Sequence, residues 1–238
     1  MLPADAFLYL HEKKLPLILS FPFEEERGHV ITGRGLCYIE KIYDSAKVIL
    51  GRFSPHRTLI CVKNNRCCFT NFEAFGKSYS CIMDDIIVDR GKIIAAIPQI
   101  MNSYHRRFIR VEPSAKLPVV LYMFSPEYGT MSVTVKDISE RGIGFLSPVL
   151  ISTGQPIVCG IRFPIQGDTF IMSKAAVKYR IDAPSRTPLN IKNGTTEQLH
   201  GSLACYGIEL FPHAMDENKI RIYIMQRDVE IRRLLQEL

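Results

Sequence analysis

Short hydrophobic runs, separated by Gly, Pro and Ser, repeat along the C-terminal half of the chain. These runs are residues 116–123, 131–138, 143–148, 156–163, 169–181 and 203–211. Runs rich in Val, Ile, Phe and Tyr between turn residues predict β-strands, and six in a row are typical of a closed antiparallel barrel or a sandwich. A polar stretch at 182–202 lies between the last two runs. We predict that it is a long hairpin tip.

The first hundred residues show a similar but less regular pattern. Their apolar runs are residues 15–21, 29–39, 46–53, 58–63, 67–72 and 78–88, and 88–100 resembles a strand or hairpin arm with a glycine turn. Since β-branched and aromatic residues favour strands, we predict a small β-rich domain here.

The pattern changes its period at the C-terminus. There the apolar residues recur every three to four positions, with charges between them, at Ile220, Ile224, Ile231, Leu234, Leu235 and Leu238. This spacing predicts an amphipathic helix. The whole pattern therefore predicts a mainly β protein of two domains, residues 1–100 and 101–238, the second ending in an α-helix.

Composition excludes several classes of protein. Apolar residues make up 47% of the 238 residues, which supports a real core and argues against disorder. The net charge of +6 suits an anionic partner without requiring one, and no long basic run marks a nucleic-acid tail. No apolar run reaches the length of a membrane span, and the N-terminus lacks the features of a signal peptide. We expect a cytoplasmic protein.

The cysteines and histidines do not form a recognisable site. Seven cysteines, an odd number without a repeating framework, favour a reducing compartment over a disulfide scaffold. The cluster at 61–68 lacks CxxC spacing, so we predict small buried hydrophobes and no metal site. The six histidines are dispersed, and no nucleophile elbow, P-loop, HExxH or dinucleotide motif occurs. We therefore predict no catalytic residue and no cofactor, and we expect that the protein is not an enzyme.

Two polar motifs near the middle of the chain carry the chemical information. The segment "YHRRFIRV" contains Arg106, Arg107 and Arg110, and Arg106 and Arg110 form RxxxR. Twenty-seven positions after Arg110, "DISERG" places Asp137, Ser139 and Gly142 in a D-x-S-x-x-G spacing between two predicted strands. Alone, each motif is better explained as a solvated linker or an ordinary Asp/Ser turn. Together and in this order they are much more specific.

Residues from about 104 to the C-terminus resemble a PilZ domain, the bacterial receptor module for cyclic di-GMP (c-di-GMP). The resemblance rests on Arg106, Arg110, "DISERG" and "YGIELF" followed by the terminal helix. It implies an antiparallel barrel, c-di-GMP as ligand, and a protein partner in motility, secretion or polysaccharide machinery. The order of a β-rich segment before the arginines is also similar to flagellar-brake proteins, in which a split-barrel domain precedes PilZ. The resemblance thus implies two domains of β-barrel type.

The chemistry of these residues fits that ligand. Arginine forks match the O6 and N7 acceptors of guanine and also bind phosphate. Asp137 can accept from guanine N–H groups, Ser139 can donate to phosphate, and Gly142 permits a positive φ or a close backbone approach. Arg141 is a further cation in the same turn, and His105 precedes the arginines. The predicted ligand-binding residues are His105, Arg106, Arg107, Arg110, Asp137, Ser139, Arg141 and Gly142.

Two other functions remain open at this point. The basic segment could be a docking strip for an acidic protein in a PilZ-like adaptor that binds no ligand. RNA binding by a basic-edged barrel would need stacking aromatic residues on one barrel face. We do not expect it, because the Phe and Tyr residues alternate with apolar neighbours in a way that fits a core.

Overall fold

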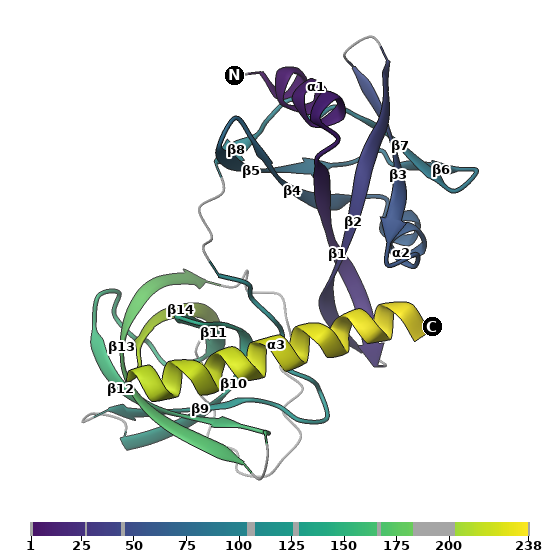
Figure 1. Ribbon diagram of the computed structural model, residues 1–238. Coiled ribbons are helices and arrows are strands. Elements are labelled where there is room, and N and C mark those ends of the chain that lie inside the picture. The colour runs from purple at the N-terminus through teal and green to yellow at the C-terminus, as the bar shows by residue number, and fades with distance from the viewer. Residues whose placement is uncertain are drawn as a thin grey trace. The chain divides into compact units, whose positions relative to one another are not determined.

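The computed structural model (Figure 1) describes residues 2–26, 28–43, 46–103, 108–125, 129–165, 168–182 and 203–237. The chain forms two compact units, one of Met1–Arg107 with Asp228–Leu238 and the other of Phe108–Arg227. Both units are built mainly from antiparallel strands, so the predicted mainly β class is confirmed. The domain boundary between residues 100 and 101 stays a prediction.

The first unit is an eight-stranded antiparallel sheet with two short helices. The strand order is β6-β7-β3-β2-β1-β4-β5-β8. The elements are α1 (Pro3–Lys13), β1 (Pro16–Glu26), β2 (His29–Tyr43), β3 (Lys47–Ser54), α2 (Thr58–Asn65), β4 (Cys68–Ala74), β5 (Lys77–Met83), β6 (Ile87–Asp89), β7 (Lys92–Ala96) and β8 (Asn102–Ser103). The hairpin with a glycine turn predicted within 88–100 is confirmed, because Asp89 pairs with Lys92 across Arg90 and Gly91.

Helix α1 covers part of this sheet although the sequence pattern did not single it out. Pro3 stands in its first turn, where a missing N–H costs nothing. Ala6, Phe7 and Leu10 are buried at helical spacing, and the Phe7 ring meets Phe72 of β4 edge-on at 5.5 Å between centroids. Burial of this one face is what fixes the helix on the sheet.

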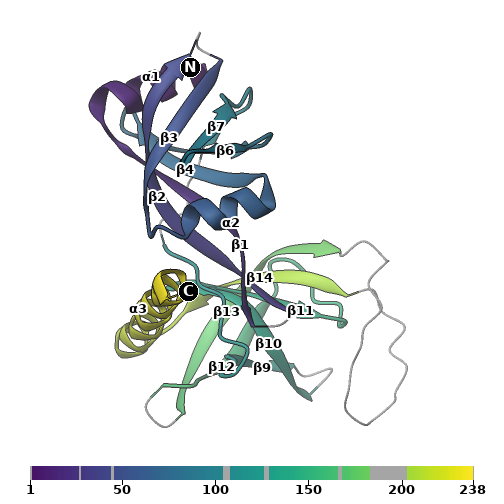
Figure 2. The ribbon, with the colours of Figure 1, turned by 90° about the vertical axis from the view of Figure 1, so that its right-hand side faces the viewer.

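The prediction of a strand at residues 58–63 is wrong. This segment belongs to α2, which lies beside β1 and β2 (Figures 1 and 2). Gly35 of β2 explains the close packing, since a Cβ there would run into the buried Thr58 side chain. Tertiary packing thus overrides the strand preference of the Thr, Ile and Val residues in this segment.

The second unit is a closed six-stranded barrel with the order β10-β11-β14-β13-β12-β9. All six strands predicted in this half are present, at β9 (Val120–Ser125), β10 (Gly129–Ser139), β11 (Gly142–Ser147), β12 (Pro156–Phe163), β13 (Thr169–Asp182) and β14 (Ala204–Phe211). Alternate residues such as Leu121, Phe145, Ile161 and Tyr206 are buried and fill the interior. Of the hairpin tip predicted at 182–202, Asp182 ends β13 and residues 183–202 lie outside the described residues.

The predicted terminal helix is confirmed as α3 (Ala214–Glu237). Its first half lies along the outside of the barrel (Figures 1 and 2), with Ile220, Tyr223 and Ile224 buried. The Tyr223 ring contacts Phe163 of β12 at 5.1 Å between centroids. This apolar contact attaches the helix to the barrel wall.

The prediction that the cysteine cluster at 61–68 is buried holds for Cys68 only, since Cys61 is half-buried and Cys67 is exposed. Cys37, Cys68 and Cys81 are buried, whereas Cys67 is exposed. Burial raises the pKa of the Cys81 thiol to about 12, and a weaker repulsion from Cys68 adds to this. Among the described residues, no group of three or more His, Cys, Asp or Glu side chains is placed to hold a metal ion. No described helix has the length and apolarity that crossing a membrane requires.

Thiol alkylation is expected to separate these cysteines. At pH 8 the thiolate fraction of a thiol with a pKa near 12 is roughly a thousandfold smaller than that of an ordinary thiol, so the folded chain should react at Cys67 and not at Cys81. Mass spectrometry of peptides after a short iodoacetamide pulse measures this. Urea should make Cys81 reactive, and equal labelling of both residues in the folded chain would contradict the burial of Cys81.

Candidate functional site

The D-x-S-x-x-G motif forms the tight hairpin between two barrel strands. Strand β10 ends at Ser139, β11 begins at Gly142, and these two residues pair across the turn. The Ser139 side chain is 5% exposed, and its hydroxyl donates to the Gly142 carbonyl over 3.3 Å. Gly142 does not have a positive φ, but a Cβ there would lie 3.2 Å from Ser139 Oγ. Of the two roles expected for this glycine, the structure shows the close approach.

Asp137 lies in a row of four cross-strand neighbours on the same part of the barrel. Asp137 of β10 pairs with Gly144 of β11, Gly144 with Gly207 of β14, and Gly207 with Tyr179 of β13. A Cβ on Gly144 would lie 2.6 Å from Asp137 Oδ2, and a Cβ on Gly207 would run into the Tyr179 ring. The two glycines therefore allow the carboxylate and the phenol to lie over the neighbouring strands.

The register of this row depends on two β-bulges. The pairing of β10 shifts between Val135 and Asp137, and that of β13 shifts between Val177 and Tyr179. A bulge adds one residue to one strand and changes the direction in which the next side chain points. Asp137 and Tyr179 each follow such a shift, at opposite ends of the row.

Arg110 completes the site and joins both ends of the row. Its Nη1 donates to Asp137 Oδ1 over 3.1 Å, and its guanidinium also hydrogen-bonds to Tyr179. Val111, the next residue, is held by two 2.9 Å backbone hydrogen bonds with Ile138. Arg110, the last residue of the RxxxR motif, thus meets Asp137, the first residue of the D-x-S-x-x-G motif.

The contacts of Arg110 favour the charged form of its guanidinium, which is charged at ordinary pH in any case. Partial burial by itself lowers the pKa of the guanidinium, but the hydrogen bond with Tyr179 and the negative charge of Asp137 outweigh it and raise the pKa. The side chains of Arg110 and Asp137 are 30% and 20% exposed, so both groups still reach solvent. A ligand can therefore receive hydrogen bonds from the cation and donate them to the carboxylate at one place.

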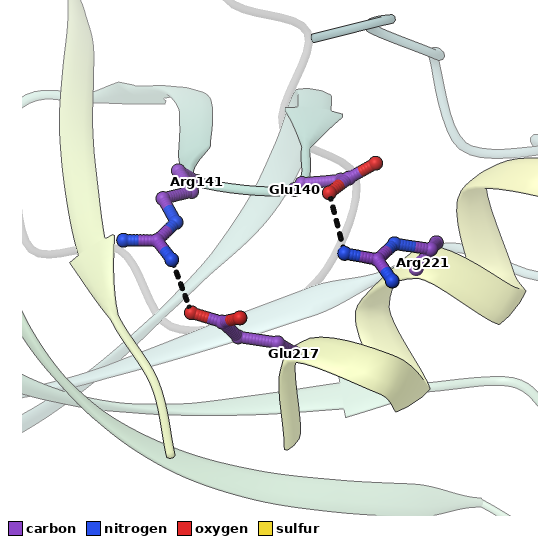
Figure 3. A network of polar contacts seen from close by, with 4 residues as sticks. All are labelled: Glu140, Arg141, Glu217 and Arg221. Atoms are coloured by element: carbon purple, nitrogen blue, oxygen red, sulfur yellow. Dashed lines mark hydrogen bonds and ion pairs between the residues drawn. The ribbon is translucent and has the colours of Figure 1, made fainter. Parts of the chain in front are cut away.

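The turn residues between Ser139 and Gly142 face helix α3. Arg141 Nη2 lies 2.6 Å from Glu217 Oε1, and Arg221 Nη2 lies 3.1 Å from Glu140 Oε2 (Figure 3). The guanidinium of Arg141 is thus engaged with the helix, and its predicted contact with a ligand stays a prediction. His105, Arg106 and Arg107 lie outside the described residues, so their roles also stay predictions.

Comparisons with known proteins found similar chains among the solved structures. No family model matches the sequence, and no curated protein matches it. Solved c-di-GMP complexes resemble this chain. YcgR from Escherichia coli in complex with c-di-GMP has 15% identity and a TM-score of 0.45, with 97% of this chain and 91% of that chain covered.

Two further solved structures are similar over most of the chain. The K. pneumonia MrkH complex with c-di-GMP has 14% identity and a TM-score of 0.47, and 97% of this chain and 94% of that chain are covered. The Bacillus subtilis inhibitor of motility MotI/DgrA has 15% identity and a TM-score of 0.43, with coverages of 91% and 97%. These similarities are low, and the function proposed below rests on the residues of this chain.

Sequence reasoning missed three residues of the row beside Asp137. None of Gly144, Gly207 and Tyr179 was assigned to the site, although Gly207 lies in "YGIELF". Both glycines stand inside the strand-like runs "IGFLSP" and "LACYGIELF". A glycine in a strand interior is unfavourable unless something approaches the backbone closely, which is a usable signal. What approaches it depends on register, which the sequence does not show.

Proposed function

We propose that this chain is a PilZ-like receptor for c-di-GMP. The proposal is supported chiefly by one observation, the placement of the Arg110 guanidinium 3.1 Å from the Asp137 carboxylate, beside the hairpin that carries Ser139 and Gly142. The proposed site is the outer barrel face around these residues. Tyr179 hydrogen-bonds to Arg110 and closes the other end of the row.

The combination of charges favours a ligand with both a base and phosphates. A site for phosphate alone gains nothing from Asp137, because a carboxylate repels an anion. Guanine offers N–H donors to that carboxylate, and its O6 and N7 atoms accept from an arginine fork. The Ser139 hydroxyl, which donates to the Gly142 carbonyl in this structure, can turn and donate to a phosphate oxygen instead. A cyclic dinucleotide of guanine supplies all of these groups.

The arginines before residue 108 are proposed to close the site. Arg106 and Arg107 directly precede Phe108, where the second compact unit begins, and come a few residues before Arg110. When the ligand binds, this segment folds over it, adding two charged donors to those of the barrel face. These contacts to the ligand then change the orientation of the two units, and a protein partner of motility, secretion or polysaccharide machinery reads this change.

The docking-strip alternative explains less of the site. A basic strip for an acidic protein needs the arginines but has no use for Asp137, which partly neutralises the strip. In that function, variants at Asp137 would strengthen partner binding. If the chain is a receptor, the same variants remove a contact to guanine and weaken the binding of c-di-GMP.

One observation favours the RNA alternative. Contrary to the prediction from the sequence, not all aromatic residues of the barrel are buried in its core. Phe145 and Phe163 are buried, but Phe124 and Phe170 are 39% and 48% exposed on the outside of the barrel. Phe170 has a packing role, since its ring lies over Gly160, where a Cβ would collide with it. A single-stranded RNA oligomer is therefore included in the test below, and we expect no binding.

Calorimetric titration of the whole chain tests the proposed function. We expect c-di-GMP to bind with a Kd of about micromolar or better, since each charge-assisted hydrogen bond contributes about 1.5–3 kcal/mol. The adenine analogue c-di-AMP should bind at least about tenfold more weakly, and Asp137→Asn should reduce this preference. No heat with c-di-GMP at high micromolar concentration would reject the receptor function, and an RNA titration with a comparable Kd would favour the RNA function.

A further inference from the structure

The two turn residues of the D-x-S-x-x-G hairpin form a double ion pair with α3. Glu140 pairs with Arg221 and Arg141 pairs with Glu217, at 3.1 Å and 2.6 Å. Glu217 and Arg221 are four residues apart on the helix, so they lie one turn apart on the same face. Figure 3 shows the two pairs side by side, with the charges alternating between turn and helix. Both turn residues are thus held by the helix.

The backbone of this turn is not of the type that two-residue hairpins prefer. With Ser139 paired to Gly142, the hairpin has a two-residue loop, and such loops favour turns in which a central residue has a positive φ. Neither Glu140 nor Arg141 has a positive φ. Turns without it splay the strands, because their twist does not match that of the hairpin. The ion pairs with α3 are contacts from outside the turn that help to keep it in its observed shape.

Further contacts connect both the turn and helix α3 to the barrel. The Arg141 carbonyl accepts from Leu210 N over 3.0 Å, which ties the turn to the end of β14. Helix α3 is itself fixed, since Tyr223 packs on Phe163 and Arg227 Nε donates to the Glu112 carbonyl over 2.9 Å. Helix α3 is therefore fixed on the barrel, and its Glu217 and Arg221 side chains hold the turn.

We propose that Glu140 and Arg141 are positioning residues, whose ion pairs with α3 keep Ser139 and Asp137 in their binding geometry. Because Ser139 directly precedes Glu140, a change in the turn changes the position of its hydroxyl and the path of β10 next to Asp137. The inference rests on the proposed function in that c-di-GMP is the ligand used to read it. By reciprocity, a ligand that holds Ser139 also stabilises the start of α3. The turn thereby connects the site to the helix.

The first experiment replaces the turn by one that needs no support. The double variant Glu140→Asn with Arg141→Gly has the preferred residues for a two-residue hairpin and loses both ion pairs. We expect its Tm to be unchanged or higher, while the affinity for c-di-GMP falls at least about tenfold. A purely structural turn would give the opposite result, with binding as in the wild type, and that outcome would overturn the proposal.

The second experiment exchanges the charges of one pair. Glu140→Arg and Arg221→Glu, made separately, should each weaken c-di-GMP binding about threefold to tenfold, and the double variant should recover most of the loss. Lys219→Glu is the matched control, because Lys219 pairs with Asp216 on the same helix at a similar exposure but does not reach the turn. It should bind as the wild type does.

Hydrogen exchange gives a readout that does not depend on affinity. Bound c-di-GMP should slow amide exchange in residues 214–221 of the wild type and not in the Asn–Gly variant. If the wild type binds no c-di-GMP, the proposed function fails. If it binds, and both single reversals bind equally well, the receptor function stands and the positioning role of Glu140 and Arg141 is rejected.

Discussion

Replacing Arg110 by alanine is expected to weaken c-di-GMP binding at least tenfold, or about 1.4 kcal/mol, and to leave the barrel folded. The change removes the donor that Arg110 offers to a guanine or phosphate. It also frees Asp137, whose carboxylate is held by Arg110 Nη1 at 3.1 Å, and leaves Tyr179 without this partner. The loss of affinity therefore has two causes. The ligand loses a hydrogen-bond donor, and Asp137 and Tyr179 are no longer held in place by Arg110. Calorimetry measures the affinity, and circular dichroism checks the fold.

Two further variants define the reason for this effect. Arg110→Lys keeps the charge but not the planar fork, so we expect it to recover only a small part of the affinity. Arg162→Ala removes an exposed arginine from β12, a strand outside the row, and should bind as the wild type does. If Arg110→Ala bound c-di-GMP as tightly as Arg162→Ala, the site would have to lie elsewhere.

Gly207→Ala is expected to reduce c-di-GMP affinity by about tenfold or more through a single methyl group. The new Cβ would occupy the place of the Tyr179 ring, so the ring must move away from the barrel wall. Arg110 then loses one of its two anchors in the row. Because the Cβ meets the ring and not the ligand motif itself, the variant tests the row as a unit.

A second glycine on the same barrel supplies the control. Gly160 of β12 lies under the ring of Phe170 as Gly207 lies under that of Tyr179. Gly160→Ala should therefore lower the Tm about as much as Gly207→Ala does, since each added methyl group displaces an aromatic ring. It should leave ligand affinity unchanged. A loss of affinity in both variants alike would mean that general destabilisation, and not the row beside Asp137, controls binding.

Sequence patterns predicted the elements of the second unit well because local chemistry determines them. Strands β9 to β14 alternate buried and outward-facing residues between turn residues, and α3 repeats apolar residues at helical spacing. The same reasoning failed at residues 58–63. There, β-branched residues form α2, and the decisive contact is with Gly35, which is distant in sequence.

The sequence alone identified Arg110, Asp137, Ser139 and Gly142, because each motif is a short run with its own chemistry. Only the tertiary structure brought Arg110 to Asp137, across 27 positions, and added Tyr179 to them. It also gave Arg141 a partner 76 residues away, on α3. The physical reason is that strand register, set here by two bulges and two glycines, decides which side chains become neighbours. A shift of one residue would turn each of these side chains to the opposite face of the barrel wall.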